Sequence, residues 1–350
     1  MLIDFHHAVT YVAARLAGFE QKEALTVAHA AQYVDDATSV QTIRFSNKAL
    51  YRRTSSSHKM LDMRNLQDEA NHVVWLPFHF LPGNDQLDAG TDFEGSFIEK
   101  IICRSNSPVA REMVDLAISQ KGKAYSLQLL GITMHVYADT WAHQGFAGVV
   151  HPVNEVEDAQ EIGQSGVFEA SLKDLLWDFV EDIIPPLGHG RAGVFPDMPF
   201  LEWKYLNGKG AWIVRNNTVD FIDAVDHMIK AMQRFLEKKE TGLDEENRVA
   251  IEKCFREFKS KDADKRHKMW LEAIANGEIP GLGKEKIQYI IGNKKGSWKY
   301  EALGSSFDLP LYDYDKSFLT SDWKLFQDSI KAHQFNLLHE ILPKYEICAA

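Results

Sequence analysis

The sequence predicts a mostly α protein that folds as a compact multi-helix bundle. Apolar residues recur at helical spacing through most of the chain, and strand signals are scarce. No internal repeat or low-complexity tract stands out. With 350 residues, of which 45% are hydrophobic, the chain is long enough to bury a large core.

Two helices are expected at the start of the chain. The first spans residues 4–17. Asp4 is a possible N-cap, and Gly18 is a favourable residue after a helix C-terminus. A second helix spans about residues 21–37, and one of its faces carries only small residues and one acid, namely Ala24, Ala28, Ala31 and Asp35. These small side chains would let another helix pack closely.

The next part of the chain has no clear helical period. In residues 38–65, Arg52, Arg53 and Ser55–Ser57 suggest an exposed excursion. The apolar segment 73–83, VVWLPFHFLPG, contains two prolines and is therefore predicted to be a buried loop. Further irregular stretches are expected at residues 84–97, 151–168 and 187–200.

More helices are predicted along the rest of the chain, at residues 107–119, 122–143, 171–184, 217–238, 244–259, 262–276, 283–292 and 320–341. The resulting domain prediction is a metal-binding helical domain at residues 1–240 and a helical C-terminal extension at 241–350 packed on it. A single domain is the alternative.

Charge and cysteine content exclude several classes of function. The net charge of −11 disfavours broad adsorption to nucleic acid or to anionic membranes. The three cysteines, Cys103, Cys254 and Cys348, are far apart and form no CxxC pair, so no disulfide framework or thiolate metal site is indicated. The N-terminal segment lacks the basic start of a signal peptide, and no apolar run approaches membrane-spanning length. We therefore expect a cytoplasmic protein.

The most informative stretch is HVYADTWAH, in which His135, Asp139 and His143 follow one another at steps of four. On a helix this spacing places the three side chains along one face. Two imidazoles and a carboxylate are suitable ligands for Zn²⁺, and the central carboxylate could serve two metals. The flanking residues are apolar, so these polar groups need partners in a buried helix. The alternative is that they are core histidines hydrogen-bonded to a carboxylate.

Three further residues are candidate ligands. His6 shares a stripe with apolar residues of the first predicted helix. Asp35 lies near a helix C-terminus, where a carboxylate opposes the helix dipole, so it is a candidate metal ligand or general base, or else a cap or ion-pair partner. His79 is held in the proline-braced segment PFHFLP, which suits a metal ligand or a specific hydrogen bond.

The segment GHGRAGVFPD contributes His189 and Asp197, with Arg191 as a possible anchor for an anionic substrate. His7, expected to be partly exposed, His29 and Asp36 are expected to support the ligands by hydrogen bonds. His58 and His72 have polar neighbours and are expected at the surface or in a supporting role.

The order of these motifs resembles the zinc-dependent phospholipase C and single-strand nuclease superfamily. This resemblance implies a mainly helical enzyme with a trinuclear zinc cluster that hydrolyses phosphate esters. The motifs DFHH, QYVDD, PFHFLPG, HVYADTWAHQG and GHGRAGVFPD also resemble those of an uncharacterised bacterial family of cytosolic proteins, over about residues 1–235.

The resemblance to the superfamily also implies a ligand assignment. Asp139 would bridge two metals, and His6 would join it at the third. Asp35, His79, His135 and Asp139 would surround one metal, with Asp35 also orienting the attacking water. His143, His189 and Asp197 would form the second set. The superfamily uses a free amino-terminal residue as a ligand; here Asp4 or His7 is a substitute, or that site is absent.

The leading hypothesis is a metal-dependent hydrolase of phosphate esters that uses two or three divalent ions, zinc foremost. Its substrate would be a small-molecule or lipid phosphate ester. The rival hypothesis is a non-catalytic metal- or ligand-binding helical protein with a buried His/Asp network. A phosphohydrolase of the HD type fits less well, because the adjacent His-Asp pair that it needs is absent.

Overall fold

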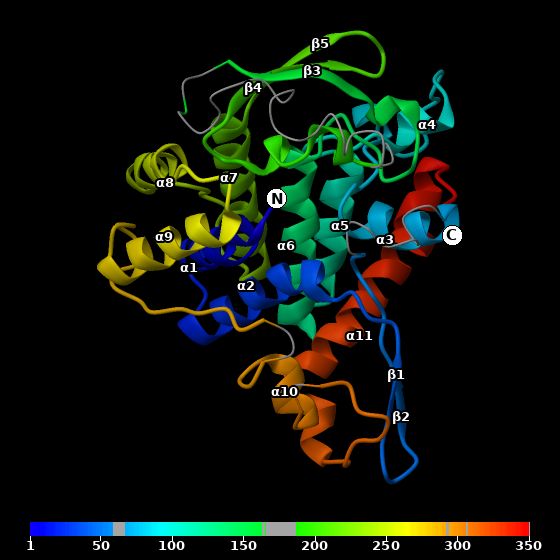
Figure 1. The fold of residues 1–350 in the computed structure, drawn as a ribbon, viewed down its shortest axis with the longest axis vertical. Coiled ribbons are helices and arrows are strands. Elements are labelled where there is room, and N and C mark those ends of the chain that lie inside the picture. Colours follow the sequence, from blue (N-terminus) through cyan, green and yellow to red (C-terminus); the bar gives the residue numbers. More distant parts are fainter. Residues whose placement is uncertain (59–66, 163–164, 166–186, 292–293, 306, 350) are drawn as a thin grey trace.

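The computed structural model describes residues 1–58, 67–162, 165, 187–291, 294–305 and 307–349, and it shows a helix-rich fold with two small antiparallel sheets (Figure 1). The helices are α1 (Thr10–Ala17), α2 (Gln21–Asp36), α3 (Asp68–Phe78), α4 (Phe97–Ile101), α5 (Pro108–Ser119), α6 (Ser126–Ala142), α7 (Asn217–Phe235), α8 (Glu245–Glu257), α9 (Ala263–Asn276), α10 (Trp298–Leu303) and α11 (Asp322–Phe335). The strands are β1 (Thr42–Arg44), β2 (Leu50–Arg52), β3 (Val156–Glu161), β4 (Glu202–Asn207) and β5 (Trp212–Asn216). The prediction of a helix-rich protein is confirmed, while neither sheet was expected.

Helix α6 lies at the centre of the fold, packed by α2, α3, α5, α7 and α11 (Figure 1). Its residues from Gln128 to Ala142 are all buried. Gly131 sets the distance to α2, because a Cβ atom at this position would lie 2.4 Å from the carbonyl oxygen of Val27 and 2.6 Å from Cβ of Ala30. The small residues of α2 therefore do permit close packing, and they bring the backbone of Ala31 to α6.

The N-terminal segment differs from the prediction at its first residues. Asp4 is not an N-cap but the first residue of a buried π-helical turn, η1 (Asp4–Val9), which runs directly into α1. Its carboxylate pairs with the buried Arg266 of α9, at 2.6 Å from Nε and 3.1 Å from Nη2. This buried ion pair ties η1 to α9.

The segment 73–83 was predicted to be a loop, and this is wrong for its first half, which belongs to α3. Pro77 lies inside the last turn and cannot donate a hydrogen bond to the carbonyl of Val73. The side-chain amide of Gln334 donates to that carbonyl instead, at 2.6 Å. His333 donates from Nε2 to the carbonyl oxygen of Pro77 at 2.9 Å. The C-terminal end of α11 thus satisfies the carbonyls that Pro77 leaves exposed.

The excursion predicted at residues 38–65 is only partly exposed in the described residues. It contains the β1–β2 hairpin, and Arg52 is exposed as expected. Arg53 and Ser55–Ser57, however, are buried. Ser56 donates from its hydroxyl to the carbonyl of Val34 at 2.7 Å, so the chain returns from the hairpin to the end of α2.

The second sheet has the order β3-β4-β5 and lies at the upper end of the molecule in Figure 1. It begins inside the stretch 151–168 that was predicted to be irregular. Trp203 and Tyr205 of β4 are buried against Phe146 and Phe195. The sheet thereby holds the irregular segment around residues 187–200 against the end of α6.

Most of the C-terminal helices form where they were predicted, and α7, α8 and α9 begin and end within a few residues of their expected bounds. The helix predicted at 320–341 is α11 followed by a π-helix, η10 (Asn336–Ile341). The helix expected at 283–292 is wrong for the described residues 283–291, which are irregular, and the short α10 was not expected. The helix predicted at 171–184 lies outside the described residues. The largest hydrophobic cluster combines residues from both sides of residue 240, such as Phe5, Ile251 and Leu342.

Among the described helices, none combines the length and the apolar character that crossing a lipid bilayer requires.

His333 makes the fold sensitive to acid. Burial lowers its pKa from 6.5 to about 4, although its hydrogen bond to Pro77 acts in the other direction. The unfolded chain therefore binds more protons than the folded chain between these two values. We expect His333 to contribute stability that is complete above pH 6.5 and is lost as the pH falls toward 4, amounting to about 2 kcal/mol between pH 7 and pH 5.

The test is urea denaturation of His333→Gln at both pH values. Between pH 7 and pH 5, the free energy of unfolding of the variant should fall by about 2 kcal/mol less than that of the wild type. The exposed His339 provides the control variant His339→Gln, which should follow the wild type. Parallel pH profiles for all three proteins would contradict this account.

Candidate metal centre

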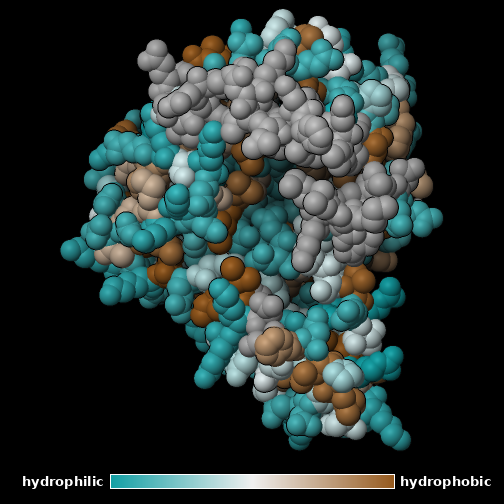
Figure 2. All heavy atoms as spheres, in the orientation of Figure 1, coloured by the Kyte–Doolittle hydropathy of each residue, from teal (hydrophilic) through white to brown (hydrophobic). Residues whose placement is uncertain are grey.

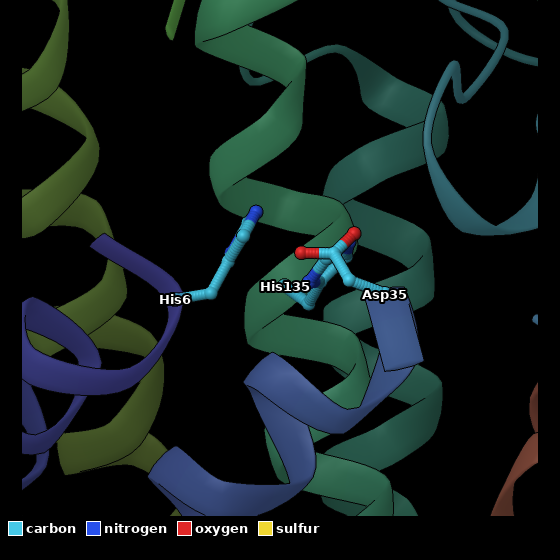
Figure 3. Close-up of side chains that lie close together, drawn as sticks. All are labelled: His6, Asp35 and His135. Atoms are coloured by element: carbon cyan, nitrogen blue, oxygen red, sulfur yellow. The ribbon is translucent and has the colours of Figure 1, made fainter. Parts of the chain in front are cut away.

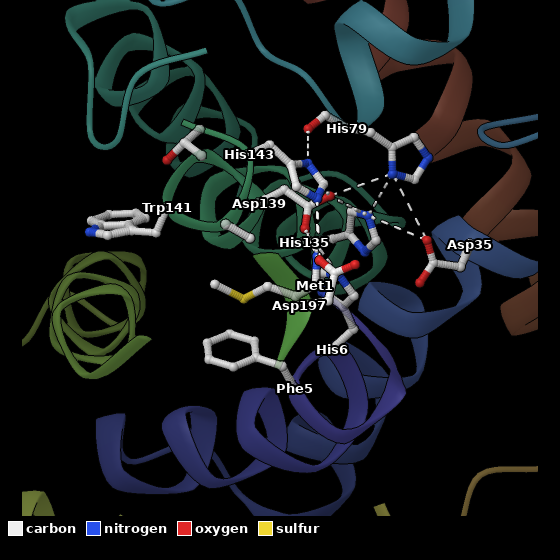
Figure 4. Close-up of polar contacts among 12 residues, drawn as sticks. Met1, Phe5, His6, Asp35, His79, His135, Asp139, Trp141, His143 and Asp197 are labelled. Carbon is white, nitrogen blue, oxygen red and sulfur yellow. Dashed lines mark hydrogen bonds and ion pairs between the residues drawn. The ribbon is translucent and has the colours of Figure 1, made fainter. Parts of the chain in front are cut away.

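The structure brings all eight predicted metal ligands together. They come from five segments: η1, the end of α2, the residue after α3, the end of α6 with the residue that follows it, and the irregular segment before β4. Figure 4 labels all of them except His189. Three groups have one ligand atom per residue within 4.8 Å of one another: His6, Asp35 and His135; His79, His135 and Asp139; and His143, His189 and Asp197.

Asp139 lies at the centre of these groups and is 1% exposed. Its Oδ1 is 2.5 Å from the amino nitrogen of Met1 and 3.2 Å from Nε2 of His6. Burial alone would raise the pKa of this carboxyl, but His143, the Met1 amino group and His135 hold it well below its usual value. Asp139 is thus a buried carboxylate that stays ionised.

Four of the histidines are oriented by the same device, a ring N–H that donates to a backbone carbonyl. The donor and acceptor pairs are His79 Nε2 and Ser56 at 2.9 Å, His135 Nδ1 and Ala31 at 2.8 Å, His143 Nδ1 and His79 at 2.7 Å, and His189 Nδ1 and Gly193 at 2.9 Å. A carbonyl only accepts, so each of these nitrogens carries the proton. In a neutral ring the other nitrogen then presents a lone pair, which is the usual arrangement of metal-binding histidines.

The lone pairs meet other acceptors in the interior. Nε2 of His135 is 3.3 Å from Nδ1 of His79 and 3.3 Å from Oδ2 of Asp139, and Nδ1 of His79 is 3.5 Å from the same oxygen. Ligands held tetrahedrally at about 2.0–2.1 Å from zinc are separated by roughly the same distance. Three acceptors that face one another repel unless a cation or a proton lies between them.

Burial keeps the ring nitrogens in their metal-binding form. The pKa values of His135 and His143 are lowered to about 4, and that of His6 to about 3, chiefly by burial in each case. Asp139 opposes this shift in all three rings, but it is outweighed. Because only a neutral imidazole can bind a metal, these histidines need not lose a proton at neutral pH to do so.

Asp35 is the most exposed member of the cluster, with 30% of its side chain accessible. Figure 3 shows it beside His6 and His135, each residue coming from a different helix. Its Oδ1 is 3.9 Å from both His79 Nδ1 and His135 Nε2. Burial and the charge of Asp139 raise its pKa well above the usual value, whereas the Met1 amino group opposes the shift.

The group of His143, His189 and Asp197 is positioned by an aromatic contact. Gly188 has a φ of +52°, and a Cβ atom on it would lie 2.1 Å from the ring of Phe80. The glycine therefore lets the segment pack on Phe80. The ring of Phe80 also stacks on His143, at 4.6 Å between centroids. His189 Nε2 then lies 3.6 Å from Oδ2 of Asp197.

The amino group of Met1 was not expected at this site. Besides Asp139, it lies 3.2 Å from Oδ1 of Asp197 and 3.3 Å from Nε2 of His143. Burial alone would lower its pKa, but Asp139 and Asp197 raise it to about 11. As an ammonium group it offsets the charge of two buried carboxylates, and as a neutral amine it would be a nitrogen ligand. The proposed substitutes are wrong in position, because Asp4 pairs with Arg266 and His7 with His267.

The ligands face a cavity of about 320 Å³. Asp35, His79, Asp139, His143, His189, Asp197 and Met1 line it together with Leu2, Ser57, His58, Trp75, Phe80, Leu187 and Gly190. In Figure 2 a recess with a hydrophilic floor opens near the middle of the face, where α6 lies in Figure 1. The cavity lining therefore combines the charged cluster with two aromatic rings, which contact His143 and His79.

Several buried atoms in the described part of the chain make no hydrogen bond and would suit a metal, although His6 Nε2 and Asp197 Oδ1 each lie 3.2 Å from an ion-pair partner. Both ring nitrogens of His6, Oδ2 of Asp139 and Oδ1 of Asp197 are buried and make no hydrogen bond there. Burying such groups without a partner costs free energy. Each is a nitrogen or carboxylate oxygen of the kind that binds zinc, so bound cations would satisfy them.

Four other residues proposed from the sequence lie away from the ligands. Arg191 is 3.7 Å from Glu155 and is not among the described residues that line the cavity. His7 is fully buried rather than partly exposed. His29 stacks on Trp298 at 3.9 Å between centroids, and Asp36 accepts a hydrogen bond from Tyr289.

Sequence reasoning missed other residues that shape the site. Trp75 and Phe80 lie in the segment whose His79 was selected, so their spacing of four and one residues from it was a usable signal. His58 was expected at the surface or in a supporting role, but it is 5% exposed and lines the cavity. Nothing in its polar neighbours indicated this position.

Comparison with known proteins identifies the family of the chain. A family of unknown function, DUF6765, matches residues 1–341. The chain belongs to this family. No curated protein and no solved structure matches it.

The position of Asp139 predicts a large effect on stability. Asp139→Asn removes the charge that faces the Met1 ammonium group, and breaking a buried pair in this way costs about 3–5 kcal/mol. In urea denaturation with a chelator present, we expect a loss of this size. The matched control is Asp115→Asn, which breaks the exposed pair with Arg234 and should cost no more than about 1 kcal/mol. Equal losses for the two variants would contradict the central role of Asp139.

Proposed function

We propose that this protein is a metal-dependent hydrolase of phosphate esters. The observation that supports this most strongly is the set of lone pairs and carboxylate oxygens from His79, His135 and Asp139, which face one another at 3.3–3.5 Å beside an open cavity. A protein that only needed a buried polar network would pair donors with acceptors. The grouping of the eight residues also agrees with the ligand sets that the resemblance to the phospholipase C and nuclease superfamily implies.

Three groups of residues would hold the metals. Asp35, His79, His135 and Asp139 would form one site, and His143, His189 and Asp197 a second. His6, the Met1 amine and Asp139 are available for a third. Divalent ions such as Zn²⁺, when bound, lower the pKa of a coordinated water toward 7 and offset the charge of phosphoryl oxygens.

Asp35 is the residue best placed to accept a proton. It is the most exposed carboxylate of the cluster and borders the cavity, so a water or substrate can reach it. A positioned carboxylate can orient the attacking water and take its proton. Asp139, in contrast, is 1% exposed, so its role would be to bind metal and to hold the neighbouring groups in place.

Trp75, Phe80 and Leu187 would contact the organic part of the substrate. These side chains cover one side of the cavity, and they exclude water from the reacting phosphoryl group. A volume of about 320 Å³ matches a small organic phosphate or the head of a lipid phosphate ester rather than a folded nucleic acid. The net charge of −11 likewise favours a small substrate.

The proposal predicts bound metal. Protein purified without added metal should contain two or three zinc or similar divalent ions per chain by elemental analysis, and His135→Ala should lower this number by at least one. The control His72→Ala, a partly exposed residue outside the cluster, should leave the metal content unchanged. A metal content near zero in every preparation would favour the non-catalytic alternative.

The proposal also predicts activity. The metal-loaded protein should hydrolyse a generic aryl phosphodiester slowly, and a chelator should abolish the reaction. Asp35→Asn should reduce the rate more than about tenfold, because a general base typically contributes about 10²–10⁴-fold. Asp226→Asn, a change in a partly buried carboxylate of α7 that pairs with Lys230, is the control and should keep the rate.

Metal-replete protein that hydrolyses no phosphomonoester, phosphodiester, phospholipid or single-stranded nucleic acid would overturn the hydrolase proposal. With metal still bound, such a protein would be a metal- or ligand-binding protein.

A further inference from the structure

A second cavity adjoins the metal centre. It has a volume of about 450 Å³ and lies between the end of α2, the residue after β2, α10 and α11. Asp35 and His58 line both cavities, so the two share a wall. We call it the Arg53 cavity, after the buried guanidinium on its surface. The metal centre and the Arg53 cavity therefore lie side by side.

Two buried cations line the Arg53 cavity. Arg53 is 4% exposed and Lys299 is 8% exposed. Both contact the same oxygen, Oδ1 of Asp308, at 3.1 Å from Nη1 of Arg53 and 2.7 Å from Nζ of Lys299. Asp308 therefore bridges the two cations, and Asp35 and Asp36 line the same cavity. Asp36, on the same wall, hydrogen-bonds Tyr289 and forms no described ion pair with either cation.

The two cations also have donors left over. A guanidinium has five N–H groups and an ammonium has three. Within the described residues Arg53 makes three hydrogen bonds, two of them to Gln41 at 3.0 and 2.9 Å, and Lys299 makes one. Positive groups this deeply buried are costly unless they are paired. A second anion in the cavity would accept hydrogen bonds from the N–H groups that remain.

The rest of the wall is rigid and aromatic. Trp323 donates from Nε1 to the hydroxyl of Tyr33 at 3.1 Å, and both residues line the cavity. The cavity is thus lined by two aromatic side chains as well as by the two cations. Such a combination of an apolar wall and a few placed charges is typical of a site for a small organic anion.

We propose that the Arg53 cavity binds a second oxyanion of the substrate, a phosphate or a carboxylate, while the scissile phosphate ester lies at the metal centre. The part of this inference that places a scissile phosphate ester at the metal centre rests on the proposed function. It narrows the substrate class to small phosphate esters that carry another anionic group. Arg53 and Lys299 act here as specificity residues, and they do not touch the reacting atoms.

The first experiment compares three 4-nitrophenyl phosphodiesters, whose second aryl group carries no charge, a carboxylate or a phosphate. We expect kcat/KM to be at least tenfold higher for one or both charged diesters than for the neutral one. Lys299→Met and Arg53→Gln should each reduce this preference about tenfold, since each removes a charge-assisted hydrogen bond. The better charged substrate distinguishes phosphate from carboxylate.

The matched control is Lys100→Met. Lys100 is 11% exposed in its side chain, nearly as buried as Lys299 at 10%, and it pairs with Glu346 away from the cavity. It should keep the preference of the wild type. If both cavity variants keep it as well, the inference is wrong, whatever the rate of hydrolysis.

The second experiment does not depend on hydrolysis. Calorimetric titration of the protein as purified with inorganic phosphate and with benzoate should show binding that Lys299→Met and Arg53→Gln weaken about tenfold and that Lys100→Met leaves unchanged. This result, obtained with a protein that hydrolyses nothing, would support the anion site while the hydrolase proposal failed. Binding that neither cavity variant alters would overturn the anion site.

Discussion

The structure depends on one buried charge. Asp139 lies in the last turn of a helix that is buried along most of its length, and it stays ionised there. A carboxylate in such a place must be surrounded by positive or hydrogen-bonding groups, because an unpaired buried charge would cost many kcal/mol. It is approached by the Met1 amino group at the N-terminus, by His6 of η1 and by His79 after α3. His135, one turn earlier in α6, contacts it as well. These segments thus converge on the end of α6, where they compensate a single buried charge.

Backbone carbonyls supply the second level of organisation. Those of Ser56, Ala31, His79 and Gly193 each accept a proton from a different imidazole. The hydrogen bonds connect α2, the segment after the hairpin and the segment after α3 to the ring atoms of the site. Precise placement of these ligands is therefore part of the fold itself, and an error in any of these segments would be felt at the cluster.

Much of the site followed from the sequence because its signals are local. The four-residue steps of His135, Asp139 and His143 need only a helix to place them on one face, and the small residues of α2 needed only a close partner, which Gly131 provides. The missed features depend on contacts between distant residues. The helix α3 continues through Pro77 because Gln334, more than 250 residues away, replaces the lost donor. Arg53 can be buried because Asp308 and Gln41 accept hydrogen bonds from its guanidinium group. The strand β4 is short, and its burial comes from the aromatic cluster around Trp203 rather than from a long alternating pattern.

The contact between Gly131 and α2 has a chemical consequence as well as a mechanical one. Because α2 lies so close, the carbonyl of Ala31 reaches Nδ1 of His135 and fixes which ring nitrogen carries the proton. A slight separation of the two helices would break this hydrogen bond, and the ring would then exchange between its two tautomers. The distance between two helices would in this way control the basicity of a nitrogen on the far side of the ring. Van der Waals contact and acid–base chemistry are thus coupled through a single imidazole.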